Sequence, residues 1–185
     1  MKRLLSLLLV FALVFPIVAA SDSSKKDSAE GNKKSEEATE INWVKYDEGL
    51  KMAKESGKHI LINFTTPWCG YCKKMNRTTF KEPEVIKMLD ESFISIKVDG
   101  DSKKELNIDG YKITERDLSR AEYRVRGYPT YWLLKPEGEK LGYISGYQEA
   151  GNFLDLLYFM KESLYDKMEF KEYMQNGGRK AFSKG

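Results

Sequence analysis

Two cysteines separated by two residues, placed directly after an apolar run, constrain this chain more than any other feature. The run His59–Phe64 reads HILINF, which predicts a buried strand over residues 59–65, and the polar segment after the cysteines predicts a helix from Gly70 to about Thr79. Cys69 would then lie at a helix N-terminus, where unpaired backbone N–H groups and the helix dipole favour thiolate over thiol. Cys72, one helical turn later, is within reach to form a disulfide. This pair is equipped for thiol–disulfide exchange.

Two other uses of the cysteine pair are weaker. A structural disulfide would suit an oxidising compartment, but a bridge that closes so short a loop removes little entropy from the unfolded chain. A structural zinc site needs more ligands than two cysteines and one distant histidine supply. His59, the single histidine, precedes Cys69 by at most roughly 30 Å of extended chain, so we interpret it as structural. We predict redox chemistry, with no metal and no cofactor.

The first twenty residues have the pattern of an export signal. Two basic residues precede the apolar segment Leu4–Val14, and the small residues Val18-Ala19-Ala20 form a cleavage site. The segment is short for a membrane span and Pro16 follows it, which favours a cleaved peptide over a permanent anchor, although an uncleaved signal would leave the protein tethered. No cysteine stands at the cleavage position, which excludes a lipid anchor there. We expect a periplasmic protein with no stable membrane insertion.

Charge and composition divide the remaining chain. Removal of residues 1–20 leaves 29 basic against 28 acidic residues, which gives no reason to expect a nucleic-acid partner. Residues 21–40 contain no large apolar side chain and are predicted to form a flexible linker. One domain of about 130 residues is predicted over 41–174, followed by a frayed tail over 175–185. The sequence shows no pattern of a symmetric interface, so a monomer is the default expectation.

Helix and strand periodicities alternate through the predicted domain. A very short first strand is predicted at 42–44, and helices at 47–56, from Pro83, and at 114–123 after a capping-box pattern. Strands are predicted at 93–98, 130–134 and 140–145, with 99–113 as a loop or small excursion. Apolar residues then recur at helical spacing, which predicts a long closing helix over 153–164 and a further turn at 170–174, both packed in the core. The fold class is α/β: a central mixed sheet flanked by helices on both faces, with a C-terminal helical extension.

The WCGYC stretch and the later Arg126-Gly127-Tyr128-Pro129-Thr130 element together resemble the thioredoxin family, over roughly residues 41–160. The resemblance implies the thioredoxin fold, a cis peptide bond before Pro129 that faces the cysteines, and a Tyr128 backbone that binds the substrate peptide. Trp68, Gly70 and Tyr71 would complete the substrate-binding surface. Trp68 is about as well explained as an aromatic cap on the core, and Tyr71 as a solvent-exposed residue.

Further motifs indicate which members of the family this chain resembles most. Thr79-Phe80 followed by Pro83-Glu84-Val85 is similar to the C-terminal domain of membrane thiol:disulfide interchange reductases. The 99–113 insertion, Gly146-Tyr147 and the aromatic C-terminal segment are most similar to exported thioredoxins of the SoxW type. Cys-Gly-Tyr-Cys also occurs in periplasmic disulfide isomerases, but their dimerisation domain has no counterpart here.

One position departs from the family pattern. Asn63 stands where ordinary thioredoxins carry a buried aspartate, and the lysine that accompanies it on the next strand is matched to Ser95. In the family this aspartate helps to deprotonate the second cysteine. Because an amide cannot titrate near neutral pH, we expect Cys72 to lose its proton by another route and mixed disulfides to be released more slowly.

The resemblance implies a thiol:disulfide oxidoreductase in which Cys69 attacks and Cys72 resolves the mixed disulfide. The leading hypothesis is a protein-disulfide reductase that receives electrons from a membrane thiol carrier and acts on client proteins such as apocytochromes or sulfur-oxidation enzymes. The alternatives are an oxidase or isomerase with the same chemistry, and a non-enzymatic thioredoxin-fold binding module whose disulfide is structural or regulatory.

Overall fold

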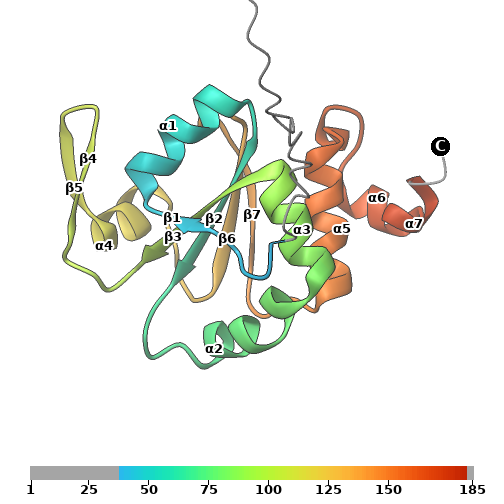
Figure 1. The fold of residues 1–185 in the computed structure, drawn as a ribbon, viewed down its shortest axis with the longest axis horizontal. Coiled ribbons are helices and arrows are strands. Elements are labelled where there is room, and N and C mark those ends of the chain that lie inside the picture. Colours follow the sequence, from blue (N-terminus) through green and yellow to red (C-terminus); the bar gives the residue numbers. More distant parts are fainter. Residues whose placement is uncertain (1–37, 183–185) are drawn as a thin grey trace, which may run out of the picture. The chain divides into compact units, whose positions relative to one another are not determined.

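The computed structural model describes residues 38–182, and the predicted signal 1–20 and most of the linker 21–40 lie outside them (Figure 1). Within the described residues the central sheet has five strands in the order β1-β3-β2-β6-β7. These are β1 (Trp43–Val44), β2 (His59–Thr65), β3 (Phe93–Asp99), β6 (Thr130–Leu134) and β7 (Lys140–Ser145). The first three are parallel, whereas β6 runs antiparallel to β2 and β7 antiparallel to β6. The predicted mixed sheet is confirmed.

Helices cover both faces of this sheet. One face carries α1 (Tyr46–Ser56), and the other carries α3 (Pro83–Ser92) and α5 (Ala150–Lys161), which lie side by side in Figure 1. The active-site helix of the sequence prediction is α2 (Gly70–Arg77), followed by the 3₁₀ turn η1 (Thr79–Lys81). No helix within residues 38–182 combines the length and apolarity required to cross a lipid bilayer.

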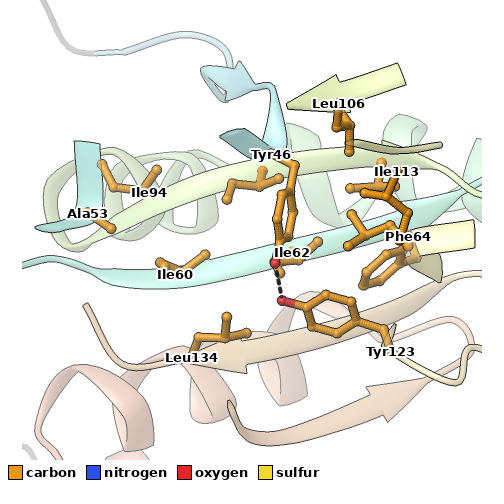
Figure 2. Close-up of a cluster of buried hydrophobic side chains, with 13 residues drawn as sticks. Tyr46, Ala53, Ile60, Ile62, Phe64, Ile94, Leu106, Ile113, Tyr123 and Leu134 are labelled. Carbon is orange, nitrogen blue, oxygen red and sulfur yellow. Dashed lines mark hydrogen bonds between the residues drawn. The ribbon is translucent and has the colours of Figure 1, made fainter. Parts of the chain in front are cut away.

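The strand β2 is apolar on both faces because each face packs against a helical layer. Ile60, Ile62 and Phe64 belong to the cluster under α1, whereas Leu61 belongs to the cluster under α3 and α5. Figure 2 shows the first cluster, in which the hydroxyls of Tyr46 and Tyr123 point toward one another and form a hydrogen bond of 2.8 Å. This buried strand leads directly to the cysteine pair.

The 99–113 segment, predicted as a loop or a small excursion, contains ordered strands. It forms a two-stranded hairpin of β4 (Glu105–Ile108) and β5 (Tyr111–Thr114), turned by Asp109 and Gly110 with φ of 51° and 93°. Both central turn residues are left-handed, the conformation that Asp-Gly favours in a hairpin. Leu106 and Ile113 are buried in the α1-face cluster. These contacts fix the hairpin to the core.

The helix predicted at 114–123 forms in two pieces. Thr114 accepts a hydrogen bond from the Asp117 N–H at 3.1 Å, so the predicted cap is present. It begins α4 (Glu115–Asp117), and a π-helical turn, η2 (Leu118–Glu122), completes the segment.

The C-terminal extension is also divided, and the frayed tail predicted for 175–185 is wrong for residues 179–182. The closing helix α5 ends at Lys161, and η3 (Leu164–Asp166), α6 (Phe170–Gln175) and α7 (Arg179–Phe182) follow. Arg179 N–H donates to Asp155 Oδ1 at 2.9 Å and the Tyr158 hydroxyl donates to Phe182 O at 3.1 Å, so α5 holds α7 in place. These long-range contacts leave no local sequence signal.

Candidate functional site

The cysteine pair lies where the sheet delivers the chain into α2. The strand β2 ends at Thr65, and Cys69 is the N-cap of α2, with its Sγ accepting a hydrogen bond from the Cys72 N–H at 3.0 Å. The two cysteines form a disulfide and their Cα atoms are 5.3 Å apart. The Cys69 sulfur therefore occupies the position in which helix N–H groups stabilise a thiolate once the bridge is reduced.

Two exposed aromatic residues flank the nearly buried disulfide. Cys69 and Cys72 are 4% and 5% exposed, whereas Trp68 and Tyr71 are 66% and 62% exposed. This exposure disfavours the alternative that Trp68 caps the core. Tyr71 lies largely in solvent, which agrees with the simpler interpretation of that residue. The disulfide thus lies beneath a rim of aromatic surface that an incoming chain can contact.

The Trp68 side chain is held by the segment after β3. Its indole N–H donates to the Asp101 carboxylate, which also pairs with Arg120 at 3.4 Å. Its ring packs edge-on against Tyr128 with centroids 5.9 Å apart. Sequence analysis missed Asp101 and Arg120 because neither has a local motif; the fold alone brings Asp101 to Trp68, the residue before Cys69, and Arg120 to Asp101.

The Tyr128–Pro129 peptide bond is cis, as the resemblance implied. The half-buried Tyr128 packs closely over Gly100, where any side chain would collide with the tyrosine ring. Burial raises the pKa of Tyr128. Gly70, by contrast, has open space around its Cα, so packing does not require glycine there.

A cavity of about 310 Å³ lies beside Cys72, and its lining includes the polar residues Asn76, Lys97 and Asp99. Asn63 is 3% exposed and its Oδ1 has no hydrogen-bond partner among the described residues. The assignment of Ser95 as the residue facing Asn63 is wrong, because Asn63 is in register with Lys97 and Ser95 with Leu61. A lysine is therefore present on the strand next to Asn63, and the aspartate alone is replaced.

His59 is remote from the dithiol, at the opposite end of β2. Its ring Nε2 is 2.9 Å from the Tyr165 hydroxyl and its ring packs edge-on against that of Tyr165. Burial lowers the pKa of His59. These contacts agree with the structural role predicted from the sequence.

The chain is similar to a protein disulfide-isomerase, a thioredoxin and another thioredoxin-fold protein. Protein disulfide-isomerase from Hordeum vulgare is 33% identical over 109 residues, which are 59% of this chain and 18% of that protein, so the chain spans less than a fifth of its length. A thioredoxin from Thermus thermophilus is 28% identical with a TM-score of 0.54, over 64% of this chain and 85% of that one. A thioredoxin-fold protein from Helicobacter pylori is 21% identical with a TM-score of 0.59, over 64% and 83%.

The family model for the thioredoxin-like domain matches residues 46–161. This range contains the cysteine pair, the cis-proline and all strands of the sheet except β1. The chain has the fold and the cysteine pair of a thiol:disulfide oxidoreductase, and it belongs to the thioredoxin-like domain family.

Proposed function

We propose that this chain is an exported protein-disulfide reductase in which Cys69 is the nucleophile and Cys72 the resolving thiol. The observation that carries the proposal is the place of Cys69 Sγ, at the N-terminus of α2 and bonded to Cys72. A structural bridge over so short a loop would add little stability, whereas the same bridge at a helix N-terminus is suited to repeated opening and closing.

The reaction consists of two exchanges. The Cys69 thiolate attacks one sulfur of a client disulfide, forms a mixed disulfide and displaces the other client sulfur as a thiolate. The Cys72 thiolate then attacks Cys69 Sγ, releases the second client sulfur as a thiolate and forms the Cys69–Cys72 disulfide seen here. Two electrons pass from the chain to the client. A membrane thiol carrier would return the pair to the dithiol by the reverse exchange.

The client peptide would bind over the cysteine pair. In this proposal the Tyr128 backbone and Pro129 hold the segment around the client disulfide, and Trp68, Gly70 and Tyr71 contact its flanks. The exposure of both aromatic rings and the open space at Gly70 support this placement. Binding through backbone and broad aromatic contacts suits a protein substrate better than one small molecule.

Export and direction of electron flow rest on sequence features. The signal pattern over residues 1–20 supports a periplasmic protein, and the resemblance to SoxW-type and interchange-reductase domains supports reduction. Clients would be disulfide-containing proteins such as apocytochromes or sulfur-oxidation enzymes. The barley relative's name, protein disulfide-isomerase, makes isomerisation the second candidate.

The reduction potential of the Cys69–Cys72 pair tests the proposal. Equilibration in glutathione or dithiothreitol buffers should give a value near or below about −220 mV for a reductase, whereas about −180 to −120 mV would favour an isomerase or oxidase. Cys69→Ser should abolish insulin reduction. A pair that is reduced only when the protein unfolds, or partner function that persists in Cys69→Ser, would instead favour the binding module.

A further inference from the structure

The strand β7 forms an open edge of the sheet. Among the described residues it pairs with β6 and with no other strand. The Gly146 N–H donates to Pro129 O at 2.8 Å, and hydrogen-bonded pairs alternate along an antiparallel ladder. Gly142 and Ile144 therefore direct their backbone groups to β6, and Tyr143 directs its N–H and C=O outward. Such an edge is a template for an added strand.

A hollow lies on each side of this edge. On the α5 face a hollow of about 430 Å³ is lined by apolar residues that include Ile144, Phe159 and Phe170. The charged residues Lys135, Glu139, Asp166 and Glu169 also line it. On the α1 face a hollow of about 550 Å³ is lined by Arg124, Arg126, Lys140, Trp132 and Tyr143. Tyr143, which is 60% exposed, contributes to both. Because side chains alternate between the faces of a strand, an added strand would place successive residues into the two hollows.

The two hollows differ in charge. None of Arg124, Arg126 and Lys140 forms an ion pair with another residue in the 38–182 range. Lys140 is held in place, since its Nζ donates to Glu122 O at 2.7 Å and lies 4.1 Å from the centre of the Tyr123 ring. Three cations with one carboxylate, Glu122, line this hollow, so it is complementary to acidic side chains. The opposite hollow has three carboxylates, Glu139, Asp166 and Glu169, with one cation, Lys135, so it disfavours acidic side chains and offers apolar ones the contacts of its apolar residues.

We propose that the β7 edge is a docking site for an extended segment of a client protein in which acidic and apolar residues alternate. This inference rests on the proposed function, because it assigns a sequence preference to the clients of the dithiol. The main chain of the segment would pair with Tyr143, its acidic side chains would contact Arg124, Arg126 and Lys140, and its apolar side chains would enter the α5-face hollow.

The β7 edge is also connected to the helix that carries the dithiol. At its C-terminal end, Gly146 bonds to Pro129, and the next residue, Tyr147, packs under Lys74 of α2 with 3.8 Å between the Nζ and the ring centre. A client docked on β7 would therefore lie next to the helix that carries the cysteines. Pairing of β7 with β7 of a second copy about a two-fold axis would bring the two cationic hollows to the same face, where like charges repel.

The probe for this site is a short labelled peptide of alternating valine and glutamate, titrated with the oxidised full chain. The matched controls are a peptide of alternating valine and lysine and a peptide of the first composition with its valines and glutamates in two blocks. We expect the alternating acidic peptide to bind at least ~10-fold more tightly than either control, with an affinity that falls as salt is added. Equal binding of all three peptides would overturn the proposal.

Two variants locate the site. Tyr143→Pro removes the outward N–H and should weaken binding at least ~10-fold, whereas Tyr143→Ala, which keeps that N–H, should weaken it less. Arg124→Glu combined with Arg126→Glu should reverse the preference between the acidic and basic peptides. Full binding by Tyr143→Pro would contradict strand addition. Self-association of the wild type that Tyr143→Pro abolishes would assign the edge to a second copy instead.

The reduction of a small disulfide, oxidised glutathione, separates this inference from the proposed function. All three variants should keep the wild-type rate, which also shows that they fold. Loss of peptide binding in a protein that reduces glutathione disulfide refutes only the docking site. A wild type that binds the acidic peptide but reduces no disulfide refutes only the reductase.

Discussion

Asn63 is the residue at which this chain departs most clearly from the chemistry of its family. Its amide lies on the same sheet face as Leu61, next to Lys97, and its Oδ1 has no partner among the described residues. An amide can orient a water but cannot accept a proton near neutral pH. Loss of the Cys72 proton should therefore depend on the groups that line the adjoining cavity, which include Lys97 and Asp99.

Asn63→Asp should accelerate the resolving step. A carboxylate at this position acts as a general base, and we expect release of the mixed disulfide to become at least ~10-fold faster at neutral pH, measured by single-turnover quenching. Ser95→Asp is the matched control, because Ser95 is equally buried on the same sheet but in register with Leu61. Equal acceleration in both variants would rule out a local base.

The same substitution should change the pH dependence of stability. Burial disfavours the charged carboxylate, so the pKa of the carboxyl group that Asn63→Asp introduces should, in the folded variant, exceed the unfolded value of about 3.9. A raised folded pKa means that the folded state binds more protons, so stability relative to the wild type should fall as pH rises from about 4. Urea unfolding across this range measures the difference.

Cys72→Ser should trap the intermediate. Cys69 can still attack, but no second thiol releases the client, so the mixed disulfide should accumulate as a stoichiometric adduct detectable by mass spectrometry. Cys69→Ser is the control and should form none. An adduct on Cys72 in that control would show that Cys72, and not Cys69, is the attacking thiol.

At the scale of elements, the β4–β5 segment ties the fold to the site. Its hairpin is anchored by Leu106 and Ile113, and the chain that enters it carries Gly100 under Tyr128 and Asp101 on Trp68. The Asp-Gly turn in NIDGYKI was a signal for this hairpin. The contact between Asp101 and Trp68 had none, because the two residues are 33 positions apart and meet only in the fold.

Asp101→Ala should weaken client binding without altering the chemistry. Loss of the hydrogen bond frees the Trp68 ring, and a bond worth about 1 kcal/mol corresponds to a rise in KM for insulin of roughly 5-fold. Reduction of oxidised glutathione should be unchanged. Glu105→Ala, an exposed change at the start of the adjoining hairpin, is the control for a general effect on the segment. A fall in kcat for both substrates would show that Asp101 acts on the cysteines themselves.

At the scale of the molecule, the C-terminal extension is joined to the sheet through His59. The histidine ring contacts Tyr165 of η3, and Glu137, Lys135 and Asp166 are the charged groups around it. Its pKa is lowered chiefly by burial, against the attraction of Glu137 and Asp166. The neutral ring is thus favoured by the fold.

This arrangement predicts acid sensitivity. Because the folded pKa is depressed below the unfolded value of about 6.5, the stability that neutral His59 contributes is present above that pH and is lost as the pH falls below it. The free energy of unfolding of the wild type should therefore decline more between pH 7 and about pH 5 than that of His59→Asn. Equal declines in the unfolding free energies of the two proteins would show that His59 does not cause the acid sensitivity.

The sequence by itself determined the bounds of the main strands and the site of the dithiol. Continuous apolar character placed β2 at the predicted residues, since that pattern reports the burial of the strand, and the turn signal between 134 and 140 placed β6 and β7 as hairpin partners. Cys69 and Cys72 could be identified from the sequence because the thiol–disulfide chemistry is carried by four consecutive residues. The family resemblance added the cis bond before Pro129.

Only the tertiary structure decided which distant residues meet. The parallel register of β2 and β3 placed Lys97, not Ser95, beside Asn63, because a shift of two positions along a strand preserves the face and leaves no mark in the apolar pattern. Asp101 on Trp68, α7 on α5 and the two hollows beside β7 arise in the same way. Local patterns specify which face a residue occupies, whereas its partners across the fold depend on register and chain path.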